Sequence, residues 1–168
     1  MITANVPELI AQLKAQLAAI DVNDLPTENQ QIAARRRYDA IQGHVSALMN
    51  LPDDVARMQA RLDPWLAQRT AYLDKEREVL KQIADAPDVT AIAAGRERDQ
   101  EEIRQIYLEQ RLKLLRDGGL FIQPGVTLGS LDVIDARITE LTQRRDRLQS
   151  SLDGHLKAAE QLLAVATS

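Results

Sequence analysis

Residues 131–162, LDVIDARITELTQRRDRLQSSLDGHLKAAEQL, decide the fold of this chain. Side chains recur there at alternating steps of three and four residues, the spacing that gathers them on one stripe of a helix. The ten positions of this seam, eight of them apolar, are Leu131, Ile134, Ile138, Leu141, Arg145, Leu148, Leu152, His155, Ala159 and Leu162. A seam sustained over more than four heptads predicts a long helix of about 131–165 packed on another helix.

The segment of about 88–117 has the composition of a partner for that helix. It starts apolar and becomes highly charged, whereas the long helix has polar flanks at its start and a wide apolar stripe near its end. If the two helices run antiparallel, like regions meet. The sequence therefore predicts a long antiparallel coiled-coil hairpin formed by helices of about 88–117 and 131–165, joined by a tip at 118–130.

The expected tip is apolar and carries no charge. Gly118-Gly119 stops one helix, Ser130 can cap the next, and Pro124-Gly125 suits the centre of a type II turn. A short β-hairpin or a tight loop is predicted, with five large side chains: Leu120, Phe121, Ile122, Val126 and Leu128. Helix connections are usually polar, so these side chains either bind a partner protein, insert into a membrane, or fold back on the hairpin.

The rest of the chain predicts three more helices in a single domain of residues 1–168. Two shorter helices are expected within residues 1–50, and Pro52 is expected to end the second one. A long helix should follow over 53–86, kinked near Pro64, because proline removes one hydrogen bond of the helix. The expected fold class is therefore all-α, a bundle of about five helices.

The segment 88–117 has two apolar stripes, where a two-stranded hairpin needs one. Ile103, Tyr107 and Leu114 form the first stripe. The second, rotated by about 140°, consists of Leu108, Leu112 and Leu115. Either the helix over 53–86 covers this second stripe, or the stripe is a surface for self-association or for another protein.

Composition excludes several classes of function. The net charge is −4, which is unsuited to gripping a phosphate backbone or an anionic membrane. The 168 residues include no cysteine, so thiolate metal sites and cysteine nucleophiles are excluded. No signal peptide and no apolar run near the ~20 residues of a membrane span appear, so we expect a cytoplasmic or otherwise soluble protein, which could be part of a larger particle.

Reactive side chains form no recognisable constellation. His44 and His155 lie far apart in the sequence with no carboxylate at ligand spacing, and each is interpreted as a ring packed at a helix edge. The arginine clusters at 35–37 and 144–147 have acidic neighbours and are interpreted as solvated helix surface. We expect no catalytic residue, no cofactor site and no metal site.

The sequence favours a non-enzymatic structural or protein-interaction subunit, such as a scaffold, an adaptor or a component of a larger assembly. It would bind a protein partner or itself through coiled-coil surfaces and the apolar tip. One alternative is a membrane-active, pore-forming component that uses the tip. A third reading is a helical protein that binds nucleic acid through its arginine clusters, which the net charge of −4 opposes.

Overall fold

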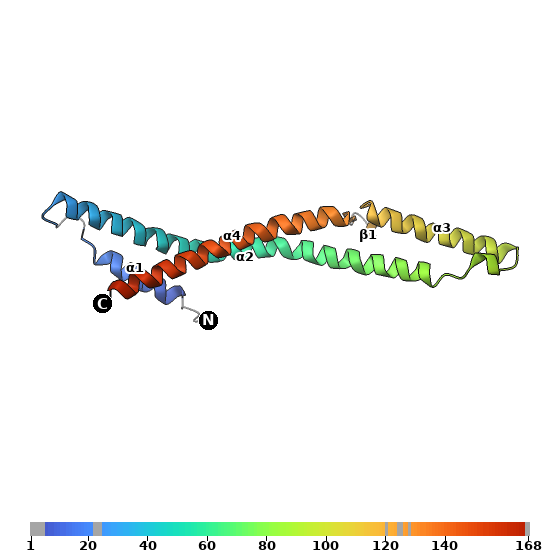
Figure 1. The fold of residues 1–168 in the computed structure, drawn as a ribbon, viewed down its shortest axis with the longest axis horizontal. Helices are drawn as coiled ribbons and strands as arrows, with labels where there is room; N and C mark the ends of the chain where they lie inside the picture. The colour runs from blue at the N-terminus through green and yellow to red at the C-terminus, as the bar shows by residue number, and fades with distance from the viewer. Residues whose placement is uncertain (1–5, 22–24, 120, 124–125, 128, 167–168) are drawn as a thin grey trace. The chain divides into compact units, whose positions relative to one another are not determined.

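The structure is a computed structural model that describes residues 6–21, 25–119, 121–123, 126–127 and 129–166. Figure 1 shows a chain built almost entirely of helices, as the sequence predicts. The elements in chain order are α1 (Val6–Ala18), α2 (Glu28–Ala84), the 3-10 helix η1 (Val89–Ala91), α3 (Arg96–Arg116), β1 (Phe121–Gln123), β2 (Val126–Thr127) and α4 (Leu131–Ala166). The chain divides into two compact units: unit 1 is Met1–Gln59 with Gln143–Ser168, and unit 2 is Ala60–Thr142.

The described residues form four α-helices, not about five, because α2 runs unbroken through Pro52 and Pro64. A proline inside a helix costs about 3 kcal/mol, which is why the sequence predicts a break at Pro52. The buried stripe of α2 stays in phase across that position: Leu48 and Leu62 lie two heptads apart and are 1 % and 2 % exposed. Packing along the continuous stripe outweighs the local cost. Whether Pro64 bends α2 stays a prediction.

Unit 1 is a three-helix bundle whose core is drawn from α1, α2 and α4. One stripe of α1 is buried because its leucines recur every four residues. The core side chains are Leu9, Leu13 and Leu17 of α1, Ile41, Val45 and Leu48 of α2, and Leu152 and Ala159 of α4. These positions on α4 belong to the predicted seam, so in unit 1 the seam packs into the bundle core.

In unit 2, α3 begins later than the sequence predicts. The stretch from Val89 to Gly95 is not α-helical: it holds η1 and an N-cap glycine, Gly95, with φ of 150°. The carboxylate of Asp88 accepts hydrogen bonds from the backbone N–H and the hydroxyl of Thr90, at 2.9 and 2.7 Å. Such a local bond to an aspartate competes with a regular helix start, so the first turns of the expected helix become a tight corner.

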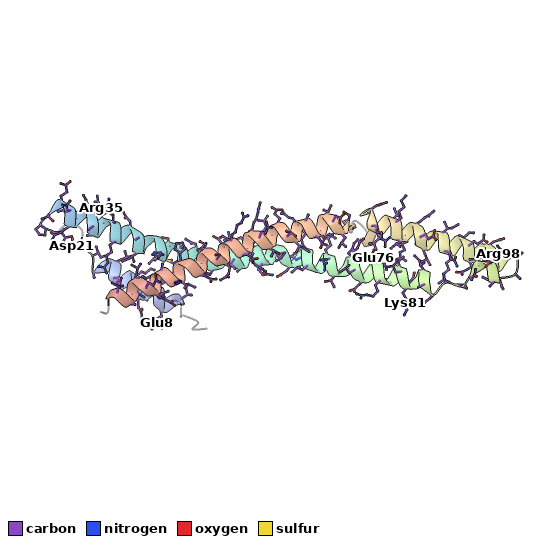
Figure 2. The ribbon with its side chains drawn as sticks, viewed as in Figure 1. Glu8, Asp21, Arg35, Glu76, Lys81 and Arg98 are labelled. Carbon is purple, nitrogen blue, oxygen red and sulfur yellow. The ribbon has the colours of Figure 1, made fainter. Side chains whose placement is uncertain are left out.

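The predicted pairing of the last two helices with each other is wrong. In unit 2, α3 packs antiparallel on α2: Gln105 donates to the carbonyl of Pro87 at 2.8 Å, and Arg116 pairs with Glu76 at 3.1 Å. Figure 2 shows Glu76 on the side of α2 that faces α3. The start of α4 lies on the same helix, where Asp135 pairs with Arg69 at 2.7 Å. Within unit 2, α3 and the start of α4 therefore follow one another along α2 (Figure 1).

The seam of α4 is as well covered as its pattern predicts, although its partner is different. None of its ten positions is exposed. In unit 2, Ile134 is fully buried in one cluster with Tyr72 of α2 and Leu115 of α3. A heptad pattern shows that a helix has a partner and says nothing about which helix that is, so the hairpin assignment was a choice that the spacing alone could not make.

Candidate interaction surface

The two apolar stripes of α3 have opposite fates in unit 2. Leu108 and Leu115 are 4 % and 0 % exposed, and Leu112 is half-buried, so the chain itself covers the stripe that was a candidate for self-association. The other stripe faces outward. Its large side chains, which we call the outer face of α3, are Ile103 (67 % exposed), Ile106 (53 %), Tyr107 (59 %) and Leu114 (51 %).

Exposed large hydrophobic side chains lie closer together on the outer face than on any other described helix. It holds four of the eleven exposed large hydrophobic residues of the described chain, and all four lie within twelve residues. At 100° per residue they fall within about 100° of the helix circumference, so they form one stripe. Single exposed hydrophobic residues are ordinary, whereas a contiguous stripe marks a surface that binds something.

The outer face ends where the apolar tip begins. The N–H of Gly119 donates to the carbonyl of Leu114 at 2.8 Å, and a Cβ placed on Gly119 would lie 3.6 Å from the Leu114 side chain. Gly118 has a φ of +78°, and a Cβ placed there would lie 2.7 Å from the backbone nitrogen of Ser130. The two ends of the tip segment therefore touch.

The tip is an insertion into the line of helices that packs on α2. From Arg116 to Asp135 the chain advances nineteen residues, while their partners Glu76 and Arg69 lie seven residues apart. Twelve residues between the two ion pairs thus add no length along α2, which matches the twelve residues from 118 to 129. Within this segment β1 and β2 pair antiparallel, with Phe121 opposite Thr127.

The structure describes only three of the five tip residues. Leu120 and Leu128 lie outside the described residues. Phe121 and Ile122 belong to β1 and Val126 to β2, and the structure places the backbone of these three. Whether the tip is exposed or folded back stays a prediction.

The structure brings together two histidines that the sequence treats as unrelated. His44 on α2 and His155 on α4 lie in unit 1 with their Nδ1 atoms 2.9 Å apart and their ring centroids 5.1 Å apart. One nitrogen donates and the other accepts, so the contact requires at least one neutral ring. Burial, followed by the nearby charge of His155, lowers the pKa of His44. Knowing that α4 packs on α2 was necessary to find this pair.

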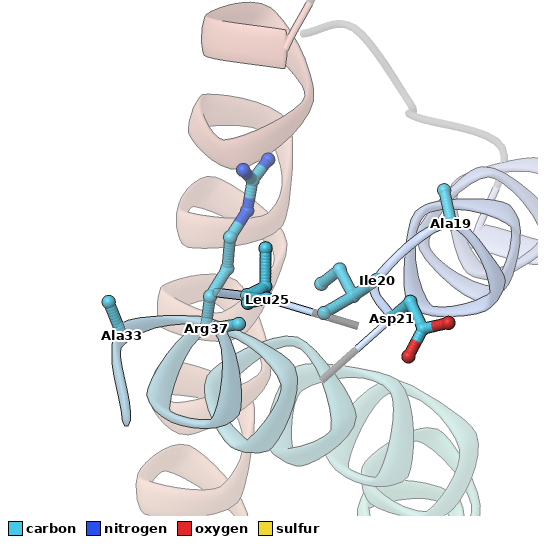
Figure 3. A pocket seen from close by; sticks show the side chains of 7 residues that line it. Ala19, Ile20, Asp21, Leu25, Ala33 and Arg37 are labelled. Carbon is cyan, nitrogen blue, oxygen red and sulfur yellow. The ribbon is translucent and has the colours of Figure 1, made fainter. Parts of the chain in front are cut away.

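The histidine pair does not extend into a metal centre among the described residues, where no three His, Cys, Asp or Glu side chains converge. Beside it, a hollow of about 660 Å³ is lined by Arg37, Ala40, His44 and four residues of α4. A second hollow of about 540 Å³ lies near the end of α1, and Figure 3 shows the side chains of Arg37 and Asp21 pointing in different directions there.

The arginine clusters do not form one basic surface. Arg145 donates to the carboxylate of Asp146 at 2.7 Å and to the side-chain oxygen of Gln59 at 3.0 Å, all within unit 1. Arg35, Arg36 and Arg37 are exposed on successive positions of α2, so their side chains point in directions about 100° apart. A stretch of three basic residues on a helix is therefore not a basic patch.

None of the described helices is both long enough and apolar enough to cross a membrane. No protein-family model, no curated protein and no solved structure matches this chain. What the protein does must therefore be inferred from its own surfaces, and the outer face of α3 is the surface with the clearest physical signature.

Proposed function

We propose that this protein is a non-enzymatic interaction subunit that binds another protein molecule through the outer face of α3. The observation that carries the proposal is the stripe of Ile103, Ile106, Tyr107 and Leu114, each more than half exposed. The structural class is that of a scaffold, an adaptor or a component of a larger assembly, and we assign it no catalytic step.

The energetics of the stripe support this role. Burying apolar surface is favourable by about 25 cal/mol per Å², so four large side chains covered together provide several kcal/mol toward association. The spacing also fits a common recognition mode, in which a helix presents apolar residues three, four and seven positions apart to a partner. Ile103, Ile106, Tyr107 and Leu114 are the residues that α3 offers in this pattern.

The inner face of α3 explains why the outer face is available. Leu108 and Leu115 are buried within unit 2, so α3 has a stable attachment that does not use the outer face. A partner can therefore bind and leave without unfolding the helix. The apolar tip begins one turn from Leu114 and would enlarge the binding surface if its side chains face outward.

A double substitution tests the proposal. Ile103→Glu with Tyr107→Glu should leave the helix content and the melting temperature nearly unchanged, since both side chains are exposed, and should abolish association with itself or with a copurified protein. Val133→Glu on α4 is the control because Val133 is 59 % exposed, as Tyr107 is, and stands alone. Native mass by light scattering and analysis of copurified proteins provide the measurement.

The proposal fails if the wild-type chain neither self-associates nor retains any protein partner. It also fails if the double substitution and the control reduce association equally, because the effect would then not belong to the outer face.

A further inference from the structure

We propose that His44 and His155 form a pH-sensitive latch between α2 and α4 in unit 1, which opens when both rings become protonated. The latch is separate from the proposed function, because it lies in unit 1 and uses no residue of the outer face of α3. Three observations carry it: the distance between the two rings, their place beside the core of unit 1, and the charges that surround them.

The hydrogen bond between the two rings tolerates one added proton but not two. Their Nδ1 atoms are 2.9 Å apart, so one nitrogen donates its proton and the other accepts it through a lone pair. The bond persists when both rings are neutral or when one ring is charged, because one Nδ1 lone pair is present in each case. When both rings are charged, both Nδ1 atoms carry a proton, and the contact becomes repulsive.

The latch lies against the core of unit 1, and both of its rings are half-buried. The side chains one turn away along each helix belong to that core: Ile41 and Leu48 on α2, and Leu152 and Ala159 on α4. A pair of positive charges at this level needs more water than the half-buried rings can reach. Water gains access when α2 and α4 move apart at this level, so a second proton favours local opening.

The charged groups of α2 and α4 do not offset the second proton. The four residues on either side of His44 are uncharged. Arg37, which lines the same hollow as His44, is itself a cation. The nearest charged residues on α4, Asp153 and Lys157, are each two positions from His155, so they project about 160° away from it around the helix.

The third helix of this core, α1, does not offset the second proton either. Its charged residues among those described are Glu8 and Lys14, and both are exposed. Among the charges of the described chain, only that of His155 acts on the pKa of His44. A doubly protonated latch therefore has no carboxylate to stabilise it.

Acid favours the open state of the latch. In the closed state burial, followed by the charge of His155, lowers the pKa of His44 below its ordinary 6.5, whereas in the open state the ring returns to the ordinary value. Below pH 6.5 the open state therefore binds more protons, and the ratio of open to closed molecules rises by up to about tenfold per pH unit. The rise ends once the lowered pKa is passed, because both states are then doubly protonated.

A single introduced cysteine tests the opening. The chain has no cysteine, and Ala159 is 0 % exposed one turn from His155, so Ala159→Cys places a thiol in the closed part of the core. Its rate of reaction with a pyridyl disulfide, which reacts with thiols at acid as well as neutral pH, is measured between pH 7.5 and 5. The same cysteine is measured together with His155→Gln, because glutamine is uncharged at every pH and its amide can still hydrogen-bond to His44.

We expect similar reaction rates with and without His155→Gln at pH 7.5. Below pH 6.5 the rate with the histidine pair intact should rise relative to the glutamine variant, by up to about tenfold per pH unit. The ratio of the two rates removes the direct effect of pH on the thiol, which is the same in both proteins. His44→Gln should behave as His155→Gln does, and circular dichroism at each pH confirms that the variants remain helical.

NMR titration of the histidine ring protons in the unsubstituted chain is a second measurement that does not depend on how any variant folds. The ring signals should follow two separate steps, because the two protons bind to one coupled pair. The inference is overturned if the ratio of the two cysteine rates is the same at pH 5 as at pH 7.5. It is also overturned if the ring signals of the unsubstituted chain follow a single step.

Discussion

The helices α3 and α4 both pack on α2, but they place their apolar residues differently. The ten seam positions of α4 are all at least half-buried, including Arg145 and His155, whose polar atoms meet Gln59 and His44. On α3, the apolar residues divide between a buried inner stripe and the exposed outer face. The single stripe of α4 is covered within the chain, whereas α3 keeps a second stripe exposed, and this is the surface that we propose for another molecule.

The contrast also separates two uses of polar residues. On α4 the polar interruptions of the seam are paired across to α2 and fix which residues face each other. On α3, Asp99 and Lys113 lie beside the outer face and make no ion pair or side-chain hydrogen bond with the described residues. The first arrangement is typical of a completed interior, and the second is typical of the rim of an interface.

The largest expected effect compares two adjacent leucines of α3. Leu115→Asp should lower the free energy of unfolding by about 3–5 kcal/mol, because Leu115 is 0 % exposed and a charged group there would lose its hydration. Leu114→Asp should cost less than about 1 kcal/mol, because Leu114 is 51 % exposed. Urea unfolding at low protein concentration measures both. Equal losses would show that the two stripes are not distinct.

A smaller effect is expected where α3 ends and the tip begins. Gly118→Ala should cost about 1–3 kcal/mol, because φ is +78° and the new Cβ would press on the backbone nitrogen of Ser130. Gly154→Ala, in the middle of α4 with nothing within 4 Å, should instead stabilise the protein by about 0.5–1 kcal/mol. Urea midpoints compare the two variants. If Gly118→Ala left the stability unchanged, Gly118 and Ser130 would not lie as close together as the structure places them.

The smallest effect concerns the polar pair of unit 1. The pKa of His44 in the folded state lies below its ordinary 6.5, so below pH 6.5 the unfolded chain takes up more protons than the folded one. Stability should therefore fall as the pH drops through 6.5, until the lower folded pKa is passed. His44→Leu should reduce the slope of the urea midpoint between pH 7 and about 5.5. A slope equal to that of the wild type would mean that the pKa of His44 is not lowered in the folded protein.

Both helices show which features depend on the sequence of a single helix. The sequence predicted the seam of α4 because the spacing of apolar residues is a property of one helix. None of the ten predicted positions is exposed. The two apolar stripes of α3 could be predicted for the same reason. What covers the second stripe was left open, because the spacing of Leu108, Leu112 and Leu115 does not say which neighbouring helix they meet.

Two predicted helix boundaries were wrong, one at Pro52 and one near Asp88. Pro52 is a strong helix breaker, yet α2 continues through it because its buried stripe keeps one phase on both sides. Asp88 was the smaller case, in which a side-chain bond to Thr90 replaced the expected first turns of α3. Local propensities amount to a few kcal/mol at most, which is the scale that packing along a long stripe can exceed.

The amino-acid sequence by itself determined an all-helical chain, the covered face of α4, the double stripe of α3 and the apolar content of the tip. These follow from periodicity and composition, which are properties of short segments. Only the tertiary structure decided that α2 is the common partner, that His44 meets His155, and that Ile103, Ile106, Tyr107 and Leu114 are left outside. Those facts depend on which helices come together, and a heptad repeat carries the same signal for every partner that offers an apolar stripe.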